Sequence, residues 1–383
     1  MDLRATEPLE LLVVQPTSFC NLDCRYCYVP DRDDRRVAAR RMLERLRDLL
    51  RASSRLPRDR PLEILWHAGE PLAAGLSFYH MADEIFADLP ADVAITRTFQ
   101  TNATLITADW CRYFTSVDAR VGVSIDGPRV VHDANRTYRN GRGSFEATMR
   151  GVRLLRDHGI ALNALMVLTE DGLSRAEAIY DFLCEEQITN VGFNVEETEG
   201  VHARSRLSRS PEARQLFARF MRTFIDLNGR DGNRIVVREL RAALHYLARR
   251  SADPNFIPDE AESRIGRILT ISRDGDIFSF SPELASGVDA DPKRFSLGNV
   301  LEIGSIDEAL QGETARRMQA EIDEGRRLCR STCRYFAVCG SGSPANKFYE
   351  NGTFASTETI KCVLHTQAMM DLLLDLAGER TRR

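Results

Sequence analysis

The first two-thirds of the chain alternates short apolar runs with longer stretches in which apolar residues recur every three or four positions. The short runs predict buried strands, and the longer pattern predicts amphipathic helices. Strands that alternate with helices in this way favour right-handed βαβ units and a parallel sheet. The expected strands are 9–14, 62–66, 95–99, 121–125, 161–168 and 191–195, and the expected helices include 38–51, 76–88, 107–114, 145–158 and 175–184.

Six such units are too few for an eight-fold barrel, so the pattern predicts a partial (β/α)6 barrel of TIM type. Polar residues or cysteines follow five of the six expected strands, including 67–71, 100–102 and 124–127. In parallel α/β barrels the carboxyl ends of the strands build the active site. We therefore expect the site at this end of the barrel.

The pattern changes near residue 210. Two amphipathic helices, 211–227 and 238–249, lead through a Pro/Asp/Glu-rich stretch into an expected β-hairpin that turns at Asp274-Gly275. Cysteine-containing loops rich in Gly, Ser and Asn follow. We divide the chain into a barrel (1–230), a helical linker (231–265) and a small C-terminal domain (266–383).

Composition narrows the class of protein. The 383 residues are 43% hydrophobic and carry a net charge of -4, which favours neither nucleic acid nor an anionic membrane as a partner. No apolar run approaches the roughly 20 residues of a membrane-spanning helix. The first residues, MDLRATEPLE, lack the features of a signal peptide. A cytoplasmic protein is the expectation.

Nine cysteines in a reducing compartment indicate metal binding or catalysis rather than disulfides. Cys20, Cys24 and Cys27 form a C-x3-C-x2-C motif, and soft thiolates select zinc or iron–sulfur clusters. A structural zinc site requires four ligands, whereas three cysteines on one short loop suit a [4Fe–4S] cluster with one free iron. A zinc site completed by distant residues is the alternative.

The remaining cysteines fall into two groups. Cys329, Cys333, Cys339 and Cys362 offer four thiolates, enough to close either a zinc site or a [4Fe–4S] cluster. Two others, at positions 111 and 184, lie on expected helices without partners and are interpreted as buried structural thiols.

With Tyr26 before its last cysteine, the first motif resembles the signature of the radical S-adenosylmethionine (SAM) enzymes, which have a partial (β/α)6 barrel. The resemblance implies that the free iron binds SAM and that one electron releases a 5'-deoxyadenosyl radical, which abstracts a hydrogen atom. Gly69-Glu70-Pro71 resembles the family's GGEP motif, with Ala68 in place of the first glycine. That motif binds the SAM amino group.

Further SAM contacts are implied by the same resemblance. Ser124 and Arg136 match residues that bind the carboxylate and ribose of SAM. Asn102 matches a residue near the cofactor, Met166-Val167 would flank the adenine, and the Tyr28 backbone would read the adenine edge.

Residues 333–362 resemble the auxiliary-cluster (SPASM) domain of radical SAM peptide maturases, most closely those that form three-residue cyclophanes in glycine-rich peptides. Full domains of this type carry seven cysteines and two clusters. Here no cysteine lies between positions 184 and 329, and Ser343 replaces another. The resemblance therefore implies one auxiliary [4Fe–4S] cluster, with Cys329 the most irregularly spaced ligand.

This resemblance implies a C–C crosslink between an aromatic ring and the β-carbon of a nearby residue in a ribosomally made precursor peptide with a leader. An external one-electron donor of flavodoxin or ferredoxin type would start the reaction. A base near the ring would take a proton. Glu283, Asp276 and Glu196 are our candidates, with Asp274 and Glu197 beside them.

Two other functions fit parts of the sequence. A sulfatase-maturase-like enzyme that oxidises a Cys or Ser side chain would share the barrel. A non-catalytic zinc or iron–sulfur electron carrier would need the cysteines but not the SAM motifs.

Overall fold

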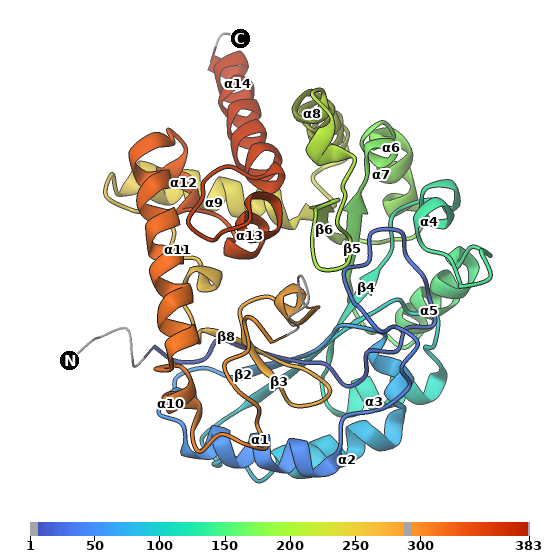
Figure 1. The fold of residues 1–383 in the computed structure, drawn as a ribbon. Helices are drawn as coiled ribbons and strands as arrows, with labels where there is room; N and C mark the ends of the chain where they lie inside the picture. Colours follow the sequence, from blue (N-terminus) through green and yellow to red (C-terminus); the bar gives the residue numbers. More distant parts are fainter. Residues whose placement is uncertain (1–6, 287–292, 382–383) are drawn as a thin grey trace.

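The computed structural model describes residues 7–286 and 293–381. All six expected strands form (Figure 1). Strands of a parallel sheet covered by helices are largely buried, which is why their sequences are apolar runs. The six strands are β1 (Leu11–Val14), β2 (Leu62–Trp66), β3 (Ile95–Thr101), β4 (Arg120–Ser124), β5 (Leu162–Leu168) and β6 (Asn190–Val195).

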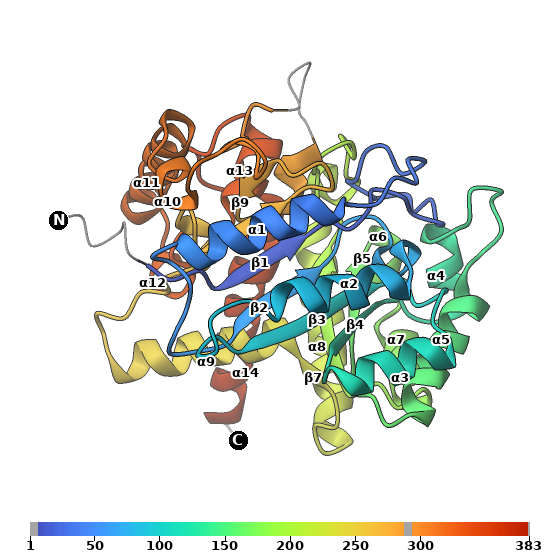
Figure 2. The ribbon, with the colours of Figure 1, turned by 90° about the horizontal axis from the view of Figure 1, so that it is seen from below.

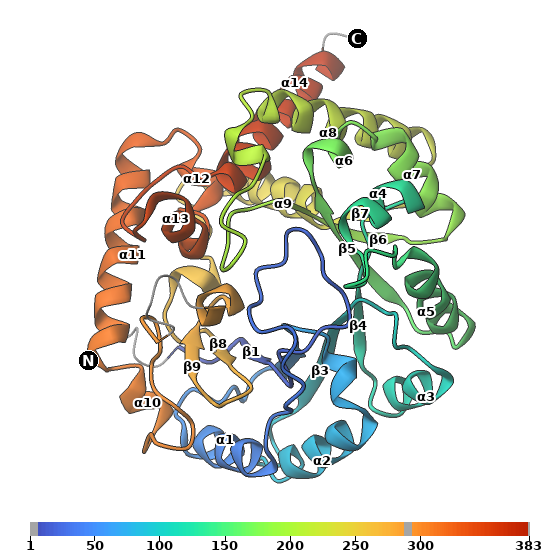
Figure 3. The same cartoon turned by 45° about the vertical axis from the view of Figure 1, so that its right-hand side comes forward.

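Helices follow the strands and lie on the outside of the curved sheet, as Figure 3 shows. Two short helices, α4 and α6, were not expected from the pattern, and the predicted helices differ from those found by a few residues at their ends. The helices of this part are α1 (Arg40–Ala52), α2 (Leu76–Phe86), α3 (Ala108–Ser116), α4 (Arg129–Asn135), α5 (Phe145–Asp157), α6 (Glu170–Leu173) and α7 (Ala176–Glu185).

The predicted α/β fold is confirmed, and its sheet is larger than the six expected strands. The strand order is β7-β6-β5-β4-β3-β2-β1-β8-β9. All neighbours are parallel except the β8–β9 hairpin, which is the hairpin expected from the sequence. The added strands are β7 (Val236–Val237), β8 (Ile268–Ile271) and β9 (Ile277–Ser279).

The segment after β6 forms one side of the molecule. β8 pairs with β1, so the main sheet includes strands from both sides of the domain boundary predicted between residues 265 and 266. Figure 1 shows α11 and α14 on the side of the molecule away from α3 and α5. Besides short 3-10 helices, the helices of this segment are α8 (Ala213–Arg230), α9 (Arg238–Ala252), α10 (Ile306–Ala309), α11 (Glu313–Thr332), α12 (Phe336–Cys339), α13 (Pro344–Asn351), a π-helix (Cys362–Ala368) and α14 (Met369–Thr381).

The core between sheet and helices is aromatic near β2 and β3. The ring of Tyr79 packs edge-on against Trp66, Phe99 and Trp110, with ring centroids 5.2, 5.0 and 5.4 Å away. The helix α1 lies along β1 (Figure 2) and buries a continuous apolar stripe. Within the described residues, no helix combines the length and the apolar character required to cross a membrane.

The turn after β2 fixes the position of the cysteine loop. Gly69 has a φ of +78°, and a Cβ built on it would lie 2.4 Å from the Thr17 carbonyl oxygen. The next residue, Glu70, donates its backbone N–H to the Phe19 carbonyl at 2.8 Å. Only glycine allows both the left-handed backbone and this close approach. The loop that carries the first cysteine is therefore attached to the end of β2.

Candidate active site

Residues 15–39 contain no helix or strand and form a loop at the carboxyl ends of the strands. Backbone hydrogen bonds hold the loop, among them Cys20 N–H to the Arg32 carbonyl at 3.0 Å and Arg25 N–H to the Asn135 carbonyl at 3.0 Å. Cys20, Cys24 and Cys27 all line one cavity of about 200 Å³. The structure therefore brings the three predicted ligands together.

The chemistry of this donor set fits a soft metal centre. Burial raises the pKa of the Cys24 thiol to about 12 and that of Cys20 further still, so the protein alone does not favour thiolates here. A bound metal reverses this preference, because it takes the deprotonated sulfur as its ligand. In the described parts of the chain, no three His, Cys, Asp or Glu side chains are grouped as ligands of a single ion. In an iron–sulfur cluster, by contrast, each cysteine binds its own iron.

Glu70 is 1% exposed and lines the same cavity. Its carboxylate accepts hydrogen bonds from Leu72 N–H (3.0 Å), Thr101 Oγ1 (2.7 Å) and Asn102 N–H (2.8 Å). Burial raises its pKa to about 7 although these donors favour the ionised form. Glu70 thus joins the ends of β2 and β3, and the Asn102 side chain continues to Asn21 at 2.9 Å.

Arg136 and Asp126 form an ion pair of 3.0 Å in which both side chains are buried. Asp126 also accepts from the Val167 N–H at 3.0 Å and from the Tyr26 hydroxyl. The buried Nε of Arg136 has no hydrogen-bond partner among the described residues. Ser124 accepts from Gln100 at 2.9 Å and lines the cavity with Arg136.

Asp126 was not among our predicted site residues. Its signal in the sequence was its place just after the fourth strand, next to Ser124. A lone strand-end Asp is too common to identify a site, whereas the ion pair with Arg136 appears only in three dimensions.

Two of the predicted SAM contacts lie outside the cavity wall. Met166 is fully buried in the core, and its neighbours Leu165 and Val167 line the cavity instead. Successive residues of a strand point to opposite faces, so of the predicted pair Met166-Val167 only Val167 lines this cavity. Pro71 begins a short 3-10 helix and is buried behind Glu70. Tyr26 and Tyr28 do line the cavity.

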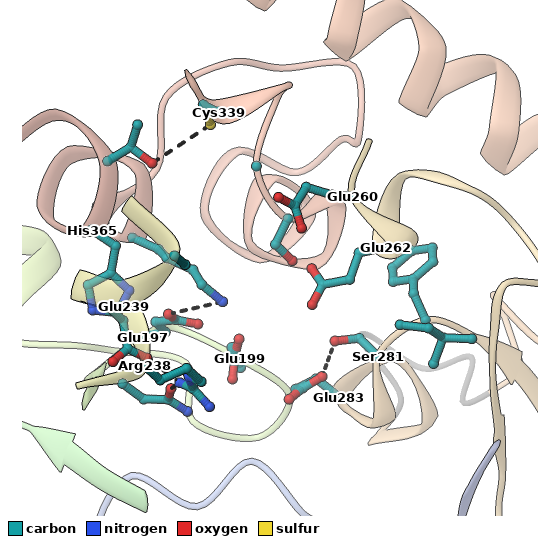
Figure 4. Close-up of a pocket in the computed structure, with 18 of the residues that line it drawn as sticks. Glu197, Glu199, Arg238, Glu239, Glu260, Glu262, Ser281, Glu283, Cys339 and His365 are labelled. Atoms are coloured by element: carbon teal, nitrogen blue, oxygen red, sulfur yellow. Dashed lines mark hydrogen bonds and ion pairs between the residues drawn. The ribbon is translucent and has the colours of Figure 1, made fainter. Parts of the chain in front are cut away.

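A second cavity, of about 540 Å³, adjoins the first. His67, Asn194, Glu197, Glu199 and Glu283 line both of them. Figure 4 shows Glu199 from the loop after β6 and Glu283 from the segment after β9 on facing walls. The lining carboxylates are Glu197, Glu199, Glu239, Glu260, Glu262 and Glu283.

Glu197 and Glu199 form a coupled pair at the junction of the cavities. The Asn346 amide donates to both, at 2.6 and 3.0 Å, and Lys361 Nζ lies 3.8 Å from Glu197. Burial works against ionisation of Glu197, but Lys361 and hydrogen bonds hold its pKa below the ordinary value. Burial and the Glu197 charge raise the pKa of Glu199 well above it. Glu199 therefore keeps its proton while Glu197 is ionised.

The structure separates the three candidate bases. Glu283 lies at the junction of the cavities, accepts from the Ser281 hydroxyl, and has a pKa that burial raises to about 7. Asp276 lines a separate cavity and accepts from the Asn299 amide at 3.0 Å. Glu196 pairs with His202 at 3.2 Å and lines neither of the two joined cavities.

The C-terminal cysteines also gather. Cys329 lies in the last turn of α11, and Cys333 directly follows that helix. Cys339 is the last residue of α12, and Cys362 is the first residue of the π-helix. Burial, together with the nearby Cys339 and Cys333, raises the pKa of the Cys362 thiol to about 12. Since no three such side chains in the described residues are grouped around a single ion, the four sulfurs suit a cluster in which each cysteine binds its own iron.

Comparisons with known proteins agree with this geometry. Residues 14–183 match the family model of the radical SAM superfamily. An uncharacterized Synechocystis protein, sll1766, is 35% identical over 391 residues, 99% of this chain and 94% of that protein. The serine-type anaerobic sulfatase-maturating enzyme of Klebsiella aerogenes is 35% identical over 183 residues, 47% of this chain and 45% of that enzyme.

Solved structures share the fold. The enzyme anSMEcpe with bound AdoMet and the Cp18Cys peptide has a TM-score of 0.78 at 19% identity, covering 97% of this chain and 99% of that one. Streptococcus suis SuiB bound to its precursor peptide SuiA has a TM-score of 0.63 at 15% identity, covering 93% of this chain and 76% of that one.

The fold and the three-cysteine cavity define a radical SAM enzyme, a class that binds a [4Fe–4S] cluster and SAM. The chain belongs to the radical SAM superfamily, and its relatives by sequence include serine-type anaerobic sulfatase-maturating enzymes.

Proposed function

We propose that this enzyme is a peptide maturase that joins an aromatic ring carbon to the β-carbon of a nearby residue in a precursor peptide. The observation that carries the proposal is the pair of joined cavities, with an ionisable carboxylate, Glu283, between them. A cavity of about 540 Å³ is in the size range of small-molecule and side-chain sites.

In this proposal Cys20, Cys24 and Cys27 hold the first cluster. A [4Fe–4S] cluster held there, with SAM bound beside it, would supply the chemistry that abstracts a hydrogen atom from the substrate. Tyr26 and Arg136 shape the neighbouring wall, where Asp126 fixes both side chains. The four C-terminal cysteines hold an auxiliary [4Fe–4S] cluster, which supplies a one-electron acceptor. An external flavodoxin- or ferredoxin-type protein delivers the starting electron.

Glu283 is the proposed base. Crosslinking removes two hydrogen atoms from the peptide, the first as an atom and the second as a proton and an electron. A base works best when its pKa lies near the operating pH, and burial places that of Glu283 at about 7. Glu199 is protonated and Glu197 is held by Asn346 and Lys361. Of the three carboxylates at the junction, Glu283 is therefore the one suited to accept a proton.

A sulfatase-maturase-like oxidation is the second candidate. It is favoured by the identity with the Klebsiella enzyme and by the similarity of the whole fold to anSMEcpe. Such a reaction converts a Ser or Cys side chain to an aldehyde and needs no aromatic ring.

One assay separates these functions. The anaerobically reconstituted enzyme is incubated with SAM, a reductant and synthetic peptides that contain Trp, Tyr or Phe but neither Ser nor Cys. A crosslinking enzyme produces a mass loss of two hydrogen atoms with no reaction toward a carbonyl reagent. Modification confined to Ser- or Cys-containing peptides, with carbonyl labelling, would support the second candidate and contradict the first.

A further inference from the structure

Lys347 of α13 is a buried lysine with an unusual environment. Only 3% of it is exposed, and its Nζ donates to Cys329 Sγ at 3.5 Å and to Ser341 Oγ at 2.7 Å. Within the described ranges 7–286 and 293–381, no carboxylate forms an ion pair with it. Lysines are rarely fully buried unless a negative group balances them, because an isolated buried charge is strongly unfavourable.

Residues from neighbouring segments pack closely around the Lys347 side chain. Gly325 lies one turn before Cys329 on α11, and a Cβ on it would lie 2.3 Å from the Phe354 carbonyl oxygen and 3.3 Å from Lys347 Nζ. Ser341 has a φ of +122°, a strained conformation for a residue with a side chain. Its hydroxyl nevertheless accepts from the lysine. Three segments thus converge on the space between Lys347 and Cys329.

Cys329 Sγ can supply the negative charge that balances Lys347. A neutral thiol is only a weak acceptor, whereas a thiolate bound to iron is anionic. The other described side-chain donors to the C-terminal sulfurs are neutral: Thr366 to Cys339 at 3.7 Å and Gln367 to Cys362 at 3.6 Å. The Lys347 bond to Cys329 is the charged one of this set.

We propose that Lys347 holds Cys329 as a ligand of the auxiliary cluster and raises the reduction potential of that cluster. This inference rests on the proposed function, since it requires a cluster at the four C-terminal cysteines. When the cluster accepts one electron it gains one negative charge, which lies close to the buried lysine. A buried positive charge and hydrogen bonds to sulfur stabilise the reduced form more than the oxidised form. Lys347 therefore makes the cluster a better electron acceptor.

The test uses full-length protein in which Cys20, Cys24 and Cys27 are all replaced by Ala, so that only the C-terminal cluster remains. Its potential is measured by a redox titration followed by electron paramagnetic resonance. Lys347→Met removes the charge, and Lys347→Arg keeps it. The control is Arg327→Met on α11, the helix that carries Cys329, where the side chain is 64% exposed and its charge is screened by water.

We expect Lys347→Met to lower the ratio of reduced to oxidised cluster at least tenfold at a fixed potential, a shift of 59 mV for one electron. Lys347→Arg and Arg327→Met should stay near the parent. Loss of cluster iron from Lys347→Met alone would also support the inference, as it would show that Cys329 needs its partner.

An iron-loaded Lys347→Met protein with the parent's potential would overturn the inference and leave the proposed function intact. An equal shift in Arg327→Met would overturn it too, because net charge would then explain the effect. A parent protein without C-terminal iron would contradict the auxiliary cluster itself, and with it both proposals.

Discussion

Asp126 shows how one buried carboxylate organises a wall of the cavity that the three cysteines line. It balances the charge of Arg136 and accepts from Val167 N–H and Tyr26. A buried charge that loses its counter-charge is costly, typically about 3–5 kcal/mol.

We expect Asp126→Asn to lower the free energy of unfolding by about that amount, measured by chemical denaturation of the metal-free protein. The matched control is Asp109→Asn, because Asp109 pairs with Arg112 on the surface where both side chains are more than half exposed. That change should cost less than about 1 kcal/mol. Equal effects in the two variants would show that the buried pair has no special weight.

Glu283 leads to a prediction about pH. Its pKa is raised to about 7 by burial, from an ordinary value of 4.5. A base must be ionised to accept a proton, so the rate of product formation should rise as pH increases through about 7 and then level. Formation of 5'-deoxyadenosine should not follow the same curve.

The comparison variant is Glu283→Gln, which should still cleave SAM but lose most of its product, by a factor of roughly 100 or more. Glu196→Gln changes a carboxylate outside the two cavities and should retain product formation. Full activity of Glu283→Gln would remove Glu283 as the base.

At the scale of elements, the turn after β2 decides where the cysteine loop lies. Gly69→Ala introduces a Cβ 2.4 Å from the Thr17 carbonyl oxygen, so the loop must move. Gly141→Ala is the control, since Gly141 has a similar φ of +79° with no atom within 4 Å. Both changes carry left-handed strain of about 1–2 kcal/mol, but only the first displaces the ligands.

The measurement is iron per chain after reconstitution. We expect Gly69→Ala to lose roughly half of it, the share of one cluster out of two. Gly141→Ala should keep the iron content of the parent. A Gly69→Ala protein with unchanged iron would show that the loop tolerates displacement.

The elements also show how far the sequence could lead. The six strands were predictable because buried parallel strands are nearly continuous apolar runs. The three cysteine ligands were predictable because they lie close together in the sequence. The second cavity was not. Glu199, Asn346 and Lys361 come from segments far apart in the chain, and nothing local marks their approach. The sequence could not separate Met166 from Val167, because apolar runs buried on both faces do not reveal which residues face the cavity.

At the scale of the whole molecule, the C-terminal third completes the sheet of the first two-thirds. β8 pairs with β1 along four residues, and Arg267 bonds to Glu10 across 257 positions of sequence. A fragment ending at residue 265 would leave β1 as an exposed edge strand. Such edges favour aggregation.

We therefore expect the fragment 1–265 to be largely insoluble, or to lack a cooperative unfolding transition by circular dichroism. The full chain under the same conditions is the reference. A soluble fragment that unfolds cooperatively would show that residues 1–265 fold independently of β8.

The β1–β8 pairing has a consequence during synthesis in the cell. The first strand made must wait for a partner that leaves the ribosome more than 250 residues later, after roughly 10–50 s at ordinary elongation rates. Throughout that time one side of β1 lacks its partner strand, although β2 can already cover the other. Ribosome pausing or chaperone supply within this interval would thus govern the yield of folded enzyme, before any cluster is inserted.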